Sequence, residues 1–166
     1  MLATRTMLFL AMAGVSGATL AADAGAPPPP AVFVSKAAQD GMTEVELGKV
    51  ALDKSKDAKV RAFAQRMVTD HGKANRELAA LARQKGIEAP NKLDTEHQDM
   101  VKKLESQDGE AFDLEYSRHM NMDHGKAIEL FEATTQSSDA DLAGFAQKTL
   151  PTLKEHKQMA SKLPGQ

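Results

Sequence analysis

Apolar residues that recur at alternating steps of four and three residues restrict most strongly what this chain can fold into. In residues 57–85 the repeating positions are Val60, Ala64, Met67, His71, Ala74, Leu78 and Leu81. Such spacing places the repeating positions on one face of an α-helix that packs against other helices. The pattern therefore predicts an all-α fold in which helices pack along their length.

Three further segments carry an inward face of the same kind and are predicted as helices over residues 31–55, 110–137 and 138–163. The inward positions are Ala37, Gly41, Glu44, Gly48 and Ala51 in the first, Phe112, Tyr116, Met120, His124, Ala127 and Phe131 in the next, and Leu142, Phe145, Thr149, Leu153, His156, Ala160 and Leu163 in the last. Small residues in the first helix let a neighbouring helix approach closely. Glu46 shares another face with Gln39, Thr43 and Lys49 and is expected to be solvated. Four long helices of this kind make a four-helix bundle.

The connection between the second and third long helices, residues 86–109, is longer than a simple antiparallel return requires. Gly86 ends the preceding helix, a loop containing Pro90 follows, and Asp94 caps a short helix that runs to about Ser106. At about 1.5 Å per helical residue, this segment can run back along the bundle. We therefore predict a ferritin-like four-helix bundle with a long crossover that carries a short extra helix between helices 2 and 3.

The N-terminus predicts export. Arg5 precedes an apolar run from Met7 to Val15, and Ala22-Asp23-Ala24 fits a cleavage site between small residues. The run is short for a membrane span, which needs about 20 residues. We expect residues 1–24 to be a cleaved signal peptide, with an uncleaved anchor as the alternative. Residues 25–30 read as a proline-rich linker and residues 31–163 as the bundle domain. The expected location is the periplasm, with no integral membrane span after cleavage.

Composition excludes several classes of function. The chain has no cysteine, so disulfides, thiolate metal sites and cysteine nucleophiles are excluded. Its net charge is −2, and it has one tyrosine and no tryptophan, so no basic surface with stacking aromatics is expected and no nucleic-acid partner is predicted. No Ser-His-Asp pattern and no glycine-rich phosphate loop is present.

Three of the five histidines fall on inward faces. His71, His124 and His156 come from three different long helices, and Glu44 lies on the inward side of the remaining one. Three of these residues lie near the middle of their helices. His156 lies about five residues past it, an offset of roughly 7 Å that helix tilt and a kink at Pro151 reduce. Imidazole and carboxylate are ordinary ligands of transition metals, so Glu44, His71, His124 and His156 are predicted to bind one Zn, Fe, Mn, Cu or Ni ion.

A metal-free interpretation also fits these residues, because a hydrogen-bonded Glu–His network satisfies buried polar groups without an ion. The segment 67–74 matches the segment 120–127 at six of eight positions, including an Asp-His-Gly-Lys-Ala run. Asp70 and Asp123 in these segments either pair with a lysine three residues later or orient the histidines. Methionines near the histidines fill gaps in the core or, alternatively, favour copper. His97 and His119 are expected at the surface.

At these residues the chain resembles the family called domain of unknown function 4142. The matching stretches are Phe33 to Leu52 with Glu44, Phe63 to Leu78 with Met67, Asp70 and His71, Phe112 to His124 with Asp113 and Tyr116, and Leu150 to His156. The resemblance covers nearly the whole expected mature chain. It implies an exported bacterial protein with a ferritin-like fold, and it implies no activity.

Ferritin chemistry is not expected here. Di-iron bundles carry a Glu-x-x-His motif on two helices, whereas Val68, Asn121 and Leu153 stand three residues before the inward histidines. We therefore expect a periplasmic metal-binding bundle that serves in metal handling or envelope stress. Two alternatives stay open. One is a metal-free structural or interaction module whose polar seam sets helix register. The other is a metal-dependent enzyme that activates water or oxygen.

Overall fold

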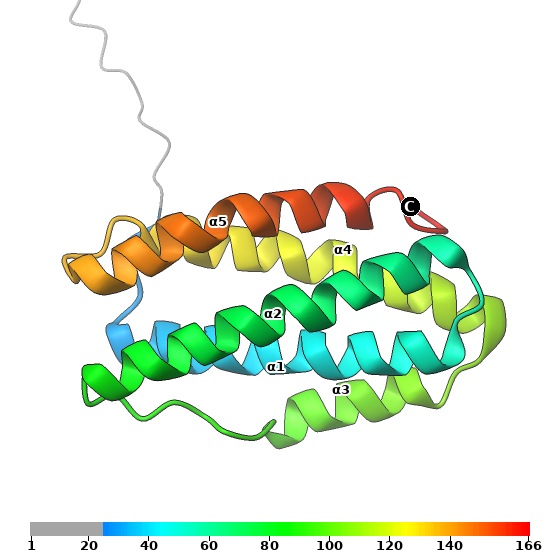
Figure 1. The fold of residues 1–166 in the computed structure, drawn as a ribbon, viewed down its shortest axis with the longest axis horizontal. Coiled ribbons are helices and arrows are strands. Elements are labelled where there is room, and N and C mark those ends of the chain that lie inside the picture. The colour runs from blue at the N-terminus through cyan, green and yellow to red at the C-terminus, as the bar shows by residue number, and fades with distance from the viewer. Residues whose placement is uncertain (1–24) are drawn as a thin grey trace, which may run out of the picture.

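The computed structural model describes residues 25–166, which contain five α-helices and no strand. The helices are α1 (Pro30–Lys54), α2 (Ala58–Gln84), α3 (Thr95–Glu105), α4 (Gly109–Thr134) and α5 (Ala140–Ala160). The all-α prediction is confirmed, and the long helices pack side by side as a bundle (Figure 1). The predicted signal peptide, residues 1–24, lies outside the described residues.

Local sequence signals set the helix ends. Asp57, Asp94 and Asp139 cap α2, α3 and α5, and each side chain accepts hydrogen bonds from backbone N–H groups of the first turn. α1 begins at Pro30, the last residue of the predicted linker, where a fixed φ suits the first helical position. Pro151 lies inside α5 on its exposed side, and the helix continues through it.

The order of the helices in space follows from the crossover. α1 packs mainly against α2, and α4 packs mainly against α5. After α2 the chain returns through α3, which packs on α1 and α4, so that α4 begins at the same end of the bundle as α2 (Figure 1). The long connection with its short helix thus lies where the sequence predicts it. Between residues 25 and 166, no helix is long and apolar enough to cross a bilayer.

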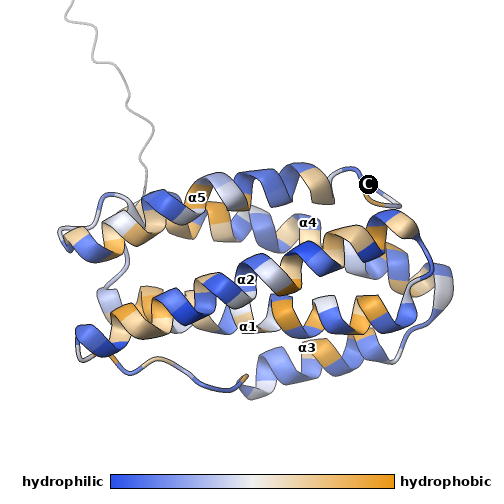
Figure 2. Cartoon of the chain, in the orientation of Figure 1, coloured by the Kyte–Doolittle hydropathy of each residue, from blue (hydrophilic) through white to orange (hydrophobic). Residues whose placement is uncertain are grey.

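The apolar core has two parts, one toward each end of the bundle. The first includes Leu47, Phe63, Met67, Phe112, Tyr116 and Met120, and the second includes Phe33, Leu78, Phe131, Leu142, Phe145 and Leu153. Along α2, α4 and α5 the histidines at positions 71, 124 and 156 fall between residues of these two parts. Figure 2 shows apolar and polar residues alternating along each helix, as amphipathic packing requires. The core therefore contains a polar layer between two apolar ones.

α1 and α2 approach closely at Gly48. A Cβ added there would lie 2.9 Å from Cγ2 of Val68 and 3.0 Å from the carbonyl oxygen of Ala64. Such contacts are too short for any side chain, so only glycine allows this spacing between the helices. The prediction that small residues in the first helix admit a close neighbour is confirmed at this position.

The crossover covers a face of α1 that the sequence assigns to solvent. Gln39 and Thr43 are buried, and Glu46 on the same face stays partly exposed. The Gln39 side chain donates to the carbonyl of Lys92 and accepts from the N–H of Asp94, both at 3.1 Å. These bonds fix the loop before α3 against α1. The polar face of α1 is thus a docking face for the crossover.

Candidate metal centre

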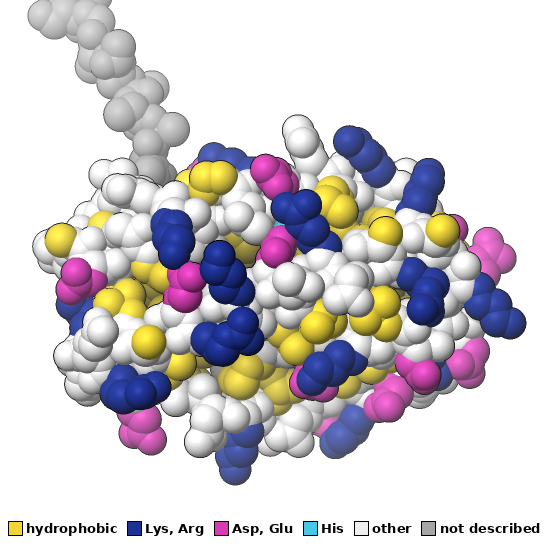
Figure 3. Space-filling model, in the orientation of Figure 1, with side chains coloured by type: hydrophobic (Ala, Val, Ile, Leu, Met, Phe, Trp, Pro, Cys, Tyr) yellow, Lys and Arg dark blue, Asp and Glu magenta, His cyan; other side chains and the backbone are white. Residues whose placement is uncertain are grey.

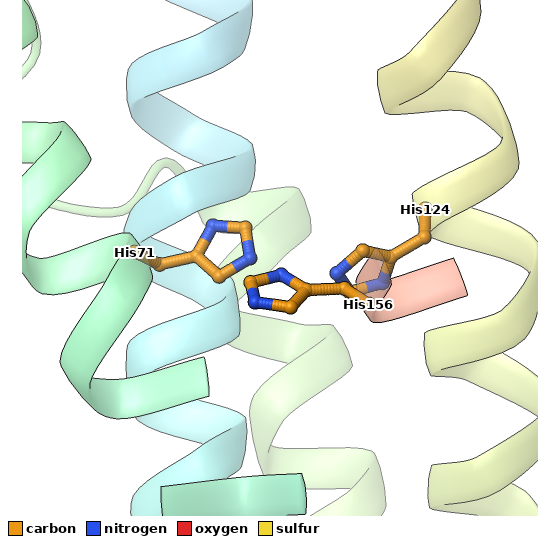
Figure 4. Close-up of side chains that lie close together, drawn as sticks. All are labelled: His71, His124 and His156. Carbon is orange, nitrogen blue, oxygen red and sulfur yellow. The ribbon is translucent and has the colours of Figure 1, made fainter. Parts of the chain in front are cut away.

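His71 on α2, His124 on α4 and His156 on α5 point toward one another in the polar layer (Figure 4). Each offers one ring nitrogen, and these nitrogens all lie within 4.8 Å of one another. The three residues are 8%, 1% and 1% exposed, so the group, here called the triad, is buried. Figure 3 shows charged side chains of both signs spread over the side of the molecule with α2 and α5, and almost no histidine is visible on that side. Three of the four predicted ligands thus meet.

Each ring of the triad has one buried nitrogen without a hydrogen-bond partner. His124 donates from Nδ1 to the carbonyl of Met120 at 2.9 Å, which leaves Nε2. Nε2 of His156 lies 2.9 Å from Oδ2 of Asp70, which leaves Nδ1. His71 has an unpartnered Nε2. A buried polar atom without a partner costs about 1–3 kcal/mol, so each ring keeps one nitrogen that a bound cation would satisfy.

The electrostatic environment keeps the triad neutral. Burial lowers the pKa of His71 well below its usual value, and the neighbouring His124 and His156 rings lower it further. Burial also lowers the pKa of His124 to about 4, although the hydrogen bond to the Met120 carbonyl opposes this shift. Burial likewise lowers the pKa of His156, although its bond to Asp70 opposes the shift. All three imidazoles are therefore neutral at neutral pH, and neutral imidazole is the form that coordinates a metal.

Asp70 orients a histidine, as one of the two sequence interpretations proposed, but the ring belongs to another helix. Asp70 contacts His156 on α5 and also accepts from Nε of Arg66 at 2.8 Å. Burial alone raises the pKa of Asp70, and the bonds from Arg66 and His156 hold it below the usual value. The carboxylate is thus charged, which favours the tautomer of His156 with a proton on Nε2 and a free lone pair on Nδ1.

Asp123, the counterpart of Asp70 in the repeat, makes different contacts. Its Oδ2 lies 2.8 Å from Nε2 of His119, and its Oδ1 lies 3.6 Å from Nζ of Lys126. The lysine contact is the surface pair that the repeat also predicted. The two repeats therefore share a local sequence, but their aspartates contact different histidines: Asp70 contacts His156 of another helix, and Asp123 contacts His119 of its own helix.

Glu44 lies beside the triad and is not a member of the close group. Its Oε1 is 3.8 Å from Nδ1 of His124, the nitrogen that already donates to Met120, and its Oε2 is buried without a partner. Burial raises the pKa of Glu44 well above its usual value, and the charges of Asp123 and Asp40 raise it further. The role of Glu44 as a metal ligand stays a prediction.

His119 corrects a sequence expectation, whereas His97 lies partly at the surface. His119 was expected at the surface but is 6% exposed. The reason is that the buried side of α4 is wider than one stripe, since Ser117 beside it is buried as well as Met120. His97 is only partly exposed, with Nδ1 2.7 Å from Oδ1 of Asp94 and Nε2 3.5 Å from Oδ1 of Asp40. These acid partners were not identified from the sequence.

A small pocket adjoins the triad. Its volume is about 40 Å³, and His71 and His156 form part of its wall together with Asp40 and Asp70. The rest of the wall is mainly apolar and includes Leu78, Phe131, Phe145 and Leu153. This space is large enough for a few water molecules, since one water needs roughly 10–15 Å³ of such volume. The pocket lies between α1, α2, α4 and α5, whose residues all contribute to its wall.

Comparisons with known proteins agree with this architecture. The model of the family described as "Domain of unknown function (DUF4142)" matches residues 16–163. No match was found among curated proteins. A crystal structure of a DUF305 fragment from Deinococcus radiodurans superposes with a TM-score of 0.70 at 18% identity, covering 83% of this chain and 97% of that one. At this identity the similarity shows the fold alone. The family match spans most of the sequence, and the chain therefore belongs to the DUF4142 family.

Proposed function

We propose that this protein binds one transition-metal ion through His71, His124 and His156 and serves in metal handling in the bacterial cell envelope. The observation that carries the proposal is the buried, unpartnered nitrogen on each of the three rings. Imidazole suits Zn, Cu, Fe and Ni, and Mn is accepted where oxygen ligands join it. We place the protein in the periplasm on the basis of the N-terminal sequence, and we interpret the bundle with its crossover as ferritin-like.

The fourth coordination position separates two forms of the proposed site. In one form the carboxylate of Glu44, now 3.8 Å from His124, moves to the ion and closes the site. In the other form a water molecule in the adjoining pocket completes the coordination. Closed four-ligand sites hold metals structurally, whereas an open position supports catalysis. We favour metal handling over catalysis because the pocket beside the triad is too small for most organic substrates.

A metal-free interaction module is the second candidate. It is favoured by the two ring nitrogens that already have partners, Nδ1 of His124 and Nε2 of His156. These bonds fix helix register without an ion. They leave one buried nitrogen on each ring without a partner, namely Nε2 of His71, Nε2 of His124 and Nδ1 of His156. For this reason we rank this candidate second.

Thermal unfolding of the chelator-treated protein with single added metals distinguishes these candidates. A metal at 100 times its Kd stabilises the fold by about 2.7 kcal/mol, which raises Tm by roughly 10 °C in a domain of this size. His71→Gln should abolish the shift, because it removes one of three ligands. His97→Gln is the matched control and should retain it, since His97 lies outside the triad. Equal Tm values with and without every metal would establish the metal-free module instead.

A further inference from the structure

The small pocket beside the triad, here called the triad pocket, adjoins a second hollow that lies between α2 and α5. This second space, here called the α2–α5 hollow, has a volume of about 120 Å³, and seven residues line it: Asp70, Lys73, Ala74, Glu77, Lys148, Thr149 and Thr152. Four of these also line the triad pocket: Asp70, Ala74, Thr149 and Thr152. The two spaces therefore share a wall made of one carboxylate and three small side chains.

Asp70 extends across this wall from solvent to the triad. Its side chain is 27% exposed, and its Oδ2 lies 2.9 Å from Nε2 of His156, whose side chain is only 1% exposed. A carboxylate that faces solvent attracts cations to its surroundings. This one also contacts a ring of the triad. A cation that arrives at Asp70 from solvent is therefore already next to the site that we propose.

The contacts that hold α2 against α5 are weak. The two helices contact each other less than α2 contacts α1 or α5 contacts α4. Two ion pairs join them at the surface, Arg66 with Glu155 at 3.0 Å and Lys148 with Glu77 at 2.7 Å. The four side chains are 35–65% exposed, and ion pairs at such positions contribute little to stability. Small separations of α2 from α5 therefore cost little free energy.

The other sides of the triad pocket are closed by packing. Asn75 is the one residue that this pocket has in common with the groove beside the loop after α2, and a Cβ added at Gly41 would overlap its side-chain oxygen. Asp40 is the one residue in common with the hollow under α3, where the bonds of Gln39 fix the crossover against α1. The side of α2 and α5 thus shares the most wall with a surface hollow.

We propose that a transition-metal ion reaches the triad through the α2–α5 hollow, past Asp70 and Thr149. The proposal rests on the proposed metal site and adds the route by which that site is loaded. The triad pocket, at about 40 Å³, has room for an ion with a few water molecules but not for a bulky chelate. An ion bound to a larger ligand must therefore leave that ligand at the surface of α2 and α5.

Co²⁺ is the probe, because its visible absorption changes when imidazole nitrogens replace water as ligands. It lies between Fe²⁺ and Ni²⁺ in the order of affinities, so a site for these metals binds it as well. Stopped-flow mixing with the chelator-treated protein gives the association rate, and a chase with excess EDTA gives the dissociation rate. Thr149→Leu enlarges a side chain of the shared wall and should slow both rates about tenfold or more. The Kd should stay within about twofold of the wild-type value, because a barrier on the route changes neither end state.

Thr69→Leu is the matched control for this substitution. Thr69 is an exposed threonine of α2 whose hydroxyl donates to the carbonyl four residues earlier, as the hydroxyl of Thr149 does. It lines neither space, so both rates should stay within about twofold of the wild-type values. Thr149→Ala makes the shared wall smaller and should speed both rates. This variant carries the test if circular dichroism shows that Thr149→Leu is not folded.

The route is overturned if Thr149→Leu and Thr149→Ala both keep the wild-type rates, or if Thr149→Leu changes the Kd as much as it changes the association rate. Either result, obtained with a Co²⁺ spectrum that His71→Gln abolishes, overturns the route alone and leaves the metal site in place. If the wild type gives no Co²⁺ spectrum, or if His71→Gln retains it, the triad does not bind the ion and both proposals fail.

Discussion

The carboxylate of Asp70 on α2 bonds the ring of His156 on α5 at 2.9 Å, and not the ring of its neighbour His71. The contact links two helices and leaves Nδ1 of His156 directed into the core without a partner. In metal sites, a carboxylate on the outer nitrogen of a ligating imidazole fixes its tautomer and raises its basicity. Asp70 is thus positioned where it would strengthen metal binding in the proposed site without contacting the ion.

Asp70→Asn should weaken transition-metal binding 10- to 100-fold, the usual effect of losing such a partner. Competition with a chromophoric chelator measures the affinity. Glu77→Gln is a matched control, because Glu77 also pairs across α2 and α5, with Lys148 at 2.7 Å, and lies outside the triad. An equal loss in both variants would mean that Asp70 acts only through the packing of the two helices.

The stability of the metal-free protein should fall as pH decreases from about 6.5 to 4. The folded pKa of His124 is about 4, below the unfolded value of about 6.5, so the unfolded chain takes up the proton first. The stabilisation is complete above pH 6.5 and is lost through this window, by roughly 3 kcal/mol for His124. The pKa values of His71 and His156 shift in the same direction. Urea unfolding at pH 7.5, 6 and 5 measures the slope, and equal stability at all three would contradict a neutral buried triad.

Glu44→Gln should stabilise the metal-free protein at pH 7.5. The folded pKa of Glu44 is raised well above its usual value by burial and by Asp123 and Asp40. A group with a raised folded pKa stabilises the fold fully below its unfolded pKa. This stabilisation is lost as pH rises through the folded pKa, by about 1.4 kcal/mol for each pH unit between the two pKa values. The gain from the neutral isostere should therefore vanish near pH 4. Glu46→Gln, at a partly exposed position paired with Lys49, is the matched control and should change the stability at pH 7.5 by less than about 0.5 kcal/mol.

Two glycine substitutions should have opposite effects. Gly48→Ala should destabilise the fold by about 1–3 kcal/mol, because the new methyl group meets Val68 and the backbone of Ala64. Gly144→Ala should stabilise it by about 1 kcal/mol, because that exposed helical position has nothing within 4 Å of the added Cβ. Urea unfolding compares the two variants. Stabilisation by both would show that α1 and α2 can separate slightly without cost.

Export remains a prediction of the N-terminal sequence. Arg5, the apolar run that follows it and the alanine-rich segment before Gly25 place the cleavage site near residue 24. Mass spectrometry of the protein from its native host should find an N-terminus between Asp23 and Gly25. Recovery of a mature protein that still begins at Met1 would refute cleavage.

The fold could be predicted from the sequence because its signals are local. Alternating steps of four and three residues identify the long helices, and aspartate caps mark where α2, α3 and α5 begin. His71 and His124 each lie near the middle of their helix, which predicted that they would meet. Residues at the centres of two packed helices lie at the same level of the bundle whether the helices run parallel or antiparallel. Helical periodicity alone was enough for that part of the site.

The remaining contacts depend on packing between elements, which periodicity does not specify. The burial of Gln39 depends on where the crossover docks, and that of His119 on how much of α4 its neighbours cover. The partner of Asp70 depends on the rotation of α5 about its axis, because the adjacent His71 was equally compatible with the sequence. The pairing of His97 with Asp40 joins residues 57 positions apart on two different helices.

The two helical hairpins contribute unequally to the triad. His71 belongs to the α1–α2 hairpin, while His124 and His156 both belong to the α4–α5 hairpin. Neither half alone contains all three rings of the triad. An ion bound by all three rings, as proposed, would therefore join the two halves of the bundle. Both hairpins must be packed together before the three rings of the triad can face one ion.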